Sequence, residues 1–102
     1  MGQGVRHLRV ANESDTFRQK RKRLTESEAR LVARTIGTLR IAETLPDDDD
    51  HDDIIPPCLP VLRRAVPETD LWVYFHVVEG AGGAIFLVTV NSLEQRLTFG
   101  PG

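Results

Sequence analysis

Residues 62–78 have the sequence LRRAVPETDLWVYFHVV, which predicts a short strand, a proline-containing turn and a second strand. One side of the second strand is apolar throughout and consists of Leu71, Val73, Phe75 and Val77. The other side carries polar and aromatic groups and consists of Trp72, Tyr74, His76 and Val78. This alternation predicts that the apolar side is buried and that the other side faces outward, with Arg63 or Arg64 one strand away.

The residues before this segment predict a helical hairpin. A basic helix is expected over 15–24, with Asn12 or Ser14 as its cap. TESE at 25–28 has the spacing of a capping box and starts the second helix, which Pro46 ends. The buried face expected for this second helix is formed by Ala29, Val32, Ala33, Ile36 and Leu39.

Two further segments complete the predicted fold. Residues 5–10 have a strand pattern, and AIFLVTV at 84–90 is apolar on both sides, as expected of a central strand. We therefore predict a single α+β domain over 1–102: an N-terminal strand, a helical hairpin and a three-stranded antiparallel meander. Both helices are expected on one face of a mostly antiparallel sheet.

Composition and charge narrow the class of protein. No apolar run approaches the ~20 residues that span a bilayer, and the first ten residues lack a signal-peptide pattern, so we expect a cytoplasmic protein without membrane contact. Cys58 is the single cysteine, which excludes an internal disulfide. Residues 1–40 hold ten Lys and Arg against four Asp and Glu, whereas the remainder holds three against eleven. This asymmetry indicates either a polyanion contact or internal charge pairing.

The segment PDDDDHDDIIPP over 46–57 is predicted to be a flexible acidic loop, because six aspartates in seven positions repel one another between flanking prolines. Carboxylates suit hard cations, but a calcium loop needs spaced ligands and a glycine at its turn. The run has neither feature. We therefore expect no metal and no cofactor.

Taken together, FRQKRKRLTESEARLVARTIGTL at 17–39, LPVLRRAVPETDLWVYFHVV at 59–78 and AIFLVTV at 84–90 resemble the RelE/ParE toxin superfamily of bacterial toxin–antitoxin systems. The resemblance implies a toxin that a cognate antitoxin neutralises. RelE-like members cleave mRNA, usually on the ribosome, whereas ParE-like members poison DNA gyrase without a nuclease site. Three positions depart from the nuclease pattern: Trp72 replaces an arginine early in its strand, and Asn91 and Ser92 replace the terminal His, Tyr or Arg group.

Metal-independent RNA cleavage needs a base for the 2′-OH, an acid for the leaving oxygen and positive charge at the phosphate. The catalytic residues implied by the resemblance are Arg63, Arg64, Tyr74 and His76. The RNA-binding residues expected are Lys20, Arg21, Arg23, Trp72 and Arg96. A structural interpretation stays open for each group: packing for the aromatic residues and the histidine, and one arginine on each side of the sheet paired with Glu68 or Asp70.

Three functions remain open at the level of sequence. The first is a RelE-like, ribosome-dependent mRNA endoribonuclease with the ribosome and mRNA as partners. The second is a ParE-like gyrase inhibitor, and the third is a RelE-fold binding module without toxicity. A homodimer through Trp72 and the last strand is compatible with each of them.

Overall fold

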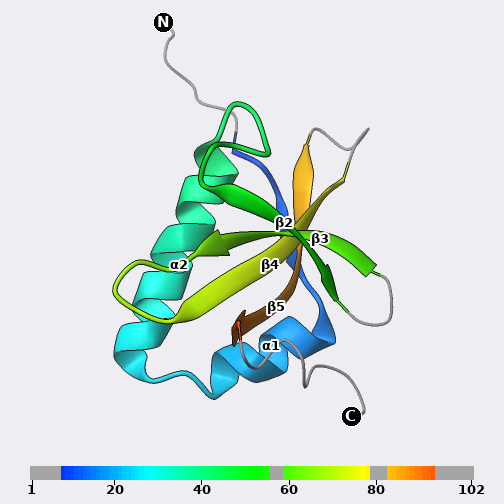
Figure 1. The fold of residues 1–102 in the computed structure, drawn as a ribbon. Helices are drawn as coiled ribbons and strands as arrows, with labels where there is room; N and C mark the ends of the chain where they lie inside the picture. The colour runs from blue at the N-terminus through cyan, green and yellow to red at the C-terminus, as the bar shows by residue number, and fades with distance from the viewer. Residues whose placement is uncertain (1–7, 56–58, 79–82, 94–102) are drawn as a thin grey trace, which may run out of the picture.

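The computed structural model describes residues 8–55, 59–78 and 83–93. Within them the chain forms β1 (Ala11–Glu13), α1 (Asp15–Lys22), α2 (Glu26–Ile41), β2 (Asp50–Ile55), β3 (Leu59–Ala65), β4 (Leu71–Val78) and β5 (Ala84–Ser92) (Figure 1). The strands form one sheet in the order β1-β5-β4-β3-β2. β1 runs parallel to β5 and every other neighbouring pair is antiparallel. The α+β class is confirmed, with one antiparallel strand more than the expected three.

The helical hairpin is confirmed, and side-chain oxygens begin both helices. Ser14 Oγ accepts the Phe17 N–H at the start of α1. At the start of α2, Thr25 Oγ1 accepts the Glu28 N–H while Glu28 Oε1 accepts the Thr25 N–H, which is the reciprocal pattern of a capping box. No helix of the described part of the chain is long and apolar enough to cross a membrane.

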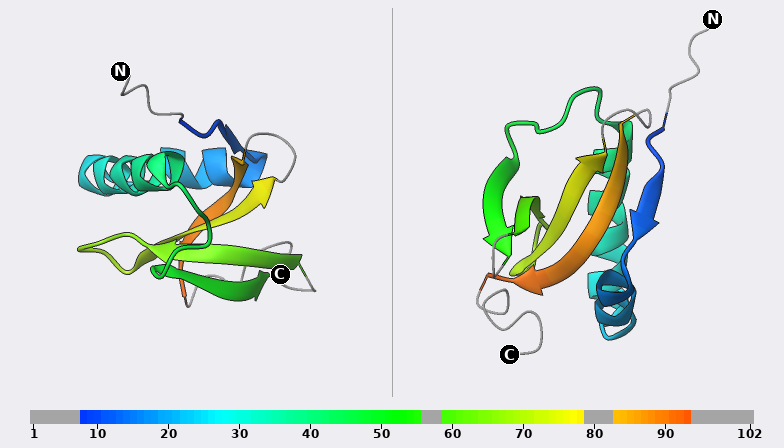
Figure 2. Two further views of the ribbon diagram at one scale, coloured as in Figure 1. Left: turned by 90° about the horizontal axis from the view of Figure 1, so that it is seen from above. Right: turned by 90° about the vertical axis from the view of Figure 1, so that its right-hand side faces the viewer.

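Both helices lie on one side of the sheet, where the main core forms (Figure 2, left). The helices contribute Phe17, Val32 and Leu39 to this core. The sheet and the turn before β4 contribute Val66, Leu71, Val73, Phe75, Ile85, Leu87 and Val90. The prediction of the buried face of α2 is wrong at Ala33, which is exposed. Thr35, which was not expected on that face, is buried. Residues 32, 35 and 39 therefore form one line of buried positions at spacings of three and four.

The N-terminal strand lies further along the chain than expected. β1 is Ala11–Glu13, whereas Leu8 and Val10 are exposed and residues 5–7 lie outside the described ranges. The Ile85 N–H donates to Val10 O and the Ser14 N–H donates to Leu87 O. Ser14, the residue that caps α1, is therefore also hydrogen-bonded to β5. The hydrogen bonds to β5 on both sides of β1, together with the start of α1 directly after it, fix the position of this strand.

The prediction of a loop over 46–57 is wrong for residues 50–55, which form edge strand β2. Two of the six aspartates are compensated, because Asp50 and Asp53 form ion pairs with Arg64 and Arg63 of β3. Pairing with cations across the strands offsets the repulsion on which the loop prediction rested. Residues 56–58, including Cys58, lie outside the described ranges.

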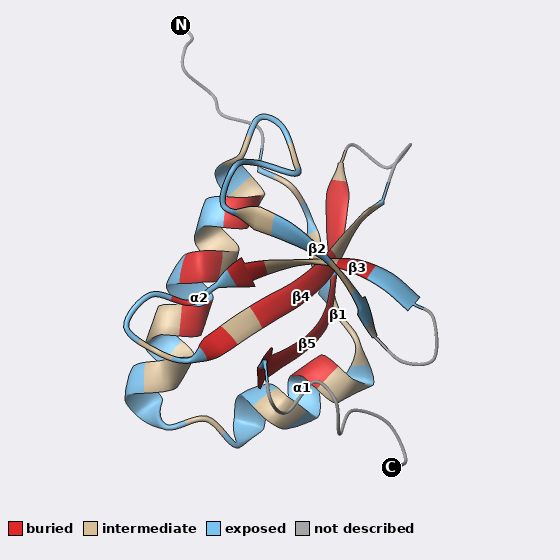
Figure 3. Ribbon diagram, viewed as in Figure 1, coloured by how far each residue is buried: buried red, intermediate tan, exposed pale blue. Residues whose placement is uncertain are grey.

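The pairing of β4 with β5 contains a bulge. Tyr74 lies opposite Thr89, but Phe75 lies opposite Leu87, so Val88 is the extra residue on β5. Val88 packs with Val61 and Tyr74 in a second cluster on the face away from the helices. β5 is thus buried on both faces, as expected of a central strand, and Figure 3 shows most of β4 and β5 as buried.

Candidate functional site

The adjacent arginines of β3 lie on opposite faces of the sheet. Arg64 is opposite Val73 of β4 and shares the helix-covered face with it, whereas Arg63 is opposite Tyr74 on the other face, here called the open face. Alternation of side chains along a strand requires this separation. The two arginines therefore cannot act together on one phosphate, and of the two only Arg63 lies on the open face.

Arg64 is a structural clamp between β3, β2 and α2. Its Nε and Nη2 donate to the two carboxylate oxygens of Asp50 at 2.6 and 2.9 Å, and its Nη1 donates to Thr38 Oγ1 at 3.1 Å. The side chains of Arg64 and Asp50 are 9% and 0% exposed. A bidentate pair with this little solvent contact uses most of the donors and charge of Arg64.

Arg63 belongs to a half-buried group on the open face that also contains Asp53 and Trp72, with the exposed His51 beside it. Its guanidinium carbon lies 4.2 Å from the centre of the Trp72 ring, and its Nε lies 3.1 Å from Asp53 Oδ2. His51 meets the indole edge-on, with ring centres 5.7 Å apart. The arrangement combines a cation–π contact with an ion pair, so the charge of Arg63 is compensated by a neighbouring carboxylate.

The other two residues of the expected catalytic set also lie on the open face but differ in exposure. Tyr74 is 0% exposed and packs with Val61, Val88 and Trp72. His76 is half-buried. It also borders a pocket of about 280 Å³, but that pocket is lined mainly from the helix-covered face, by residues such as Leu62, Phe75 and Val77. Alternation thus places Arg63, Tyr74 and His76 on one face, while burial separates the phenol from solvent.

Two polar side chains of β5, Thr89 and Asn91, were not singled out as site residues from sequence. They lie opposite Tyr74 and Trp72 on the open face and are each 1% exposed. Within the described part of the chain, neither the Thr89 hydroxyl nor the Asn91 amide has a hydrogen-bond partner. An unsatisfied buried polar group costs about 1–3 kcal/mol, so these two side chains lower the stability of the sheet.

The expected RNA-binding helix is partly neutralised by Glu13. Arg21 donates to both carboxylate oxygens of Glu13 at 2.7 and 3.0 Å, and Arg18 lies 3.8 Å from the same group. The hydrogen bond to Glu13 raises the pKa of the Arg21 guanidinium above its ordinary value. Lys20 is half-buried and Arg23 is exposed. Arg96 lies outside the described residues.

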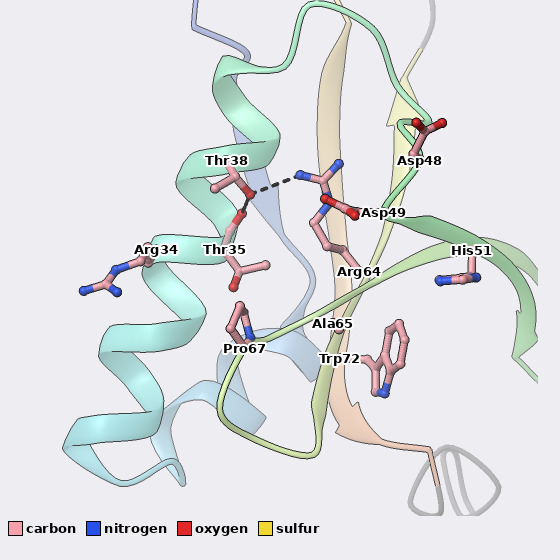
Figure 4. Close-up of a pocket in the computed structure, with 10 residues that line it drawn as sticks. All are labelled: Arg34, Thr35, Thr38, Asp48, Asp49, His51, Arg64, Ala65, Pro67 and Trp72. Carbon is pink, nitrogen blue, oxygen red and sulfur yellow. Dashed lines mark hydrogen bonds between the residues drawn. The ribbon is translucent and has the colours of Figure 1, made fainter.

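A larger pocket, of about 430 Å³, lies at the other end of β3 and was missed from sequence. It is lined by Arg34, Thr35, Thr38, Asp48, Asp49, His51, Arg64, Ala65, Pro67 and Trp72 (Figure 4). The available signal was the pair of threonines at 35 and 38, which place a buried and an exposed hydroxyl about one turn apart on α2. No three His, Cys, Asp or Glu side chains of residues 8–55, 59–78 and 83–93 are grouped so that they could hold a metal ion.

Comparison with solved structures shows a RelE-like toxin fold. The chain is similar to an archaeal RelE–RelB complex from Pyrococcus horikoshii OT3, with a TM-score of 0.63 and 14% identity over 83% of this chain and 94% of that chain. It is also similar to a metal-bound toxin from Helicobacter pylori, with a TM-score of 0.63 and 18% identity over 86% of this chain and 98% of that chain. No sequence-family description and no curated protein sequence matches the chain.

Proposed function

We propose that the protein is the toxin component of a toxin–antitoxin pair and that a cognate antitoxin neutralises it. The observation that carries the proposal is the fold: the chain matches two toxins over more than four-fifths of its length, and one of them is in a RelE–RelB complex. The sequence resemblance to the RelE/ParE superfamily, in the helical hairpin and in the strands over 59–78, supports the same conclusion.

The charges of the described residues favour a toxin that blocks its target by binding it. Arg64 is buried against Asp50, Arg63 is paired with Asp53, and the Tyr74 side chain is out of contact with solvent. A phosphate that gains negative charge during cleavage needs donors whose charge is not already compensated. Neither Arg63 nor Arg64 presents an uncompensated positive charge at the open face. The geometry therefore stabilises the negative charge of a cleavage transition state only weakly.

RNA cleavage is the second candidate, favoured by one observation. Arg63, Tyr74 and His76 share the open face, where His76 is half-buried. In this alternative His76 transfers a proton and Arg63 exchanges Asp53 for the phosphate, because an imidazole can act both as a general base and as a general acid.

Inducible expression without an antitoxin tests both candidates. We expect growth arrest with intact mRNA, measured by sequencing the 5′ ends of cellular transcripts, and chromosomal breaks if gyrase is the target. Message cleavage that His76→Ala abolishes, but the matched variant His51→Ala retains, would establish the second candidate, provided that both variants have the wild-type melting temperature. Normal growth at high expression would overturn the proposal that the protein is a toxin.

A further inference from the structure

The pocket beside α2 has no role in the function proposed above. It lies where β2 begins: Asp50 is opposite Arg64, so Ala65 of β3 has no partner on β2. Figure 4 shows α2 on one side of this opening and His51 and Trp72 on the other, with Asp48 on the segment that connects α2 to β2. The pocket is therefore built from segments distant in sequence that meet at an uncovered part of the sheet edge.

One side of the pocket is formed by the segment that connects α2 to β2, and within the described part of the chain the charges on that side that form no ion pair are negative. Asp48 and Asp49 are exposed, and among the described residues neither carboxylate forms an ion pair. Arg64 reaches the pocket, but Asp50 already compensates its charge. The guanidinium of Arg34 points away from the other lining side chains (Figure 4). An anionic occupant such as a phosphate would meet two carboxylates before it met an available cation.

The remaining wall suits a cation with a long apolar stem. The face of an indole ring attracts cations, and Trp72 already holds one guanidinium, that of Arg63, with its carbon 4.2 Å from the ring centre. Ala65, which lies opposite Trp72, and Pro67 add apolar surface to the pocket lining. Lysine and arginine bury their methylene stems against such surface while the charged end stays near water and carboxylates.

We propose that this pocket receives a lysine or arginine side chain from a protein partner. The partner that we assign to the pocket is the antitoxin, and this assignment rests on the proposed function. The growth assay is independent of the pocket, so failure of the toxin proposal and failure of the pocket proposal are distinguishable.

Trp72 is the single tryptophan of the chain, so its fluorescence reports directly on the pocket. Titration of the full chain with a hexa-arginine peptide should change Trp72 fluorescence to saturation, and added salt should weaken the binding because exposed charges are screened. Hexaglutamate and single-stranded RNA should have no effect. A saturable response to RNA without a response to hexa-arginine would overturn the proposal and indicate a nucleic-acid site.

A pair of double variants separates the pocket from general attraction to an acidic protein. Asp48→Asn with Asp49→Asn should weaken hexa-arginine binding by about tenfold, since it removes two exposed ion pairs. Asp47→Asn with Asp52→Asn makes the same change in net charge at exposed positions that do not line the pocket. An equal loss in both double variants would overturn the proposal. All four positions are exposed, so we expect unchanged melting temperatures.

Discussion

Arg63 and Arg64 are neighbours in sequence, but the two faces of the sheet give them different roles. On the helix-covered face, Arg64 is nearly enclosed and forms three hydrogen bonds, to both oxygens of Asp50 and to Thr38. On the open face, Arg63 stays half-buried between Trp72 and Asp53. The difference teaches that strand alternation, and not residue type, decides which arginine holds the fold together and which one a ligand can reach.

The largest expected effect is that of Arg64→Ala. It leaves the carboxylate of Asp50 buried without its cation, which should lower the free energy of unfolding by about 3–5 kcal/mol. Urea denaturation followed by circular dichroism measures this change. The matched variant Arg63→Ala removes a more exposed pair and a cation–π contact and should cost only about 1 kcal/mol. Similar losses in the two variants would contradict the difference between the faces.

The double variant Asp50→Leu with Arg64→Met should recover most of that loss. Replacing both partners of a buried ion pair with apolar side chains removes the unpaired charge and leaves contacts of similar volume. We expect a free energy of unfolding within about 1–2 kcal/mol of wild type, measured in the same urea titration. A double variant as unstable as Arg64→Ala would show that the ion pair and its bond to Thr38 contribute net stability.

The smallest expected effect is at Thr89 on the open face. Thr89→Val removes a buried hydroxyl that has no hydrogen-bond partner in the described part of the chain, so stability should rise by about 1 kcal/mol. On the helix-covered face, Thr35 Oγ1 donates to Leu31 O at 3.0 Å, and Thr35→Val should lower stability by about 1 kcal/mol. Thermal denaturation of both variants measures the two signs, and equal signs would contradict the hydrogen-bond assignment.

Much of the fold was predictable because its signals are local. The capping box at Thr25 and Glu28 and the alternation of residues 71–78 depend on side chains a few positions apart. The structure confirms the capping box and the two faces of the strand, but Tyr74 on the expected outward face is buried. The acidic segment shows the opposite case. Its charges predict a loop when they are considered alone, but pairing with β3 converts residues 50–55 into a strand.

The candidate site was less predictable than the fold. The grouping of Arg63, Tyr74 and His76 on one face follows from alternation, and their catalytic roles stay a prediction. The burial of Tyr74 depends on the bulge at Val88, which changes the side to which part of β5 points. The pocket beside α2 depends on where β2 begins. Neither the position of the bulge nor the residue at which β2 begins can be predicted from a short window of sequence.

The sequence by itself determined the helical hairpin, the two-sided strand and the presence of an acidic and a basic half, because capping and side-chain periodicity act over a few residues. Only the tertiary structure decided that the acidic half compensates both arginines and that Asp48 and Asp49 line the same pocket as Trp72. The physical reason is that strand register and long-range ion pairing join residues far apart in the chain, and the charge available to a ligand is what remains after that pairing.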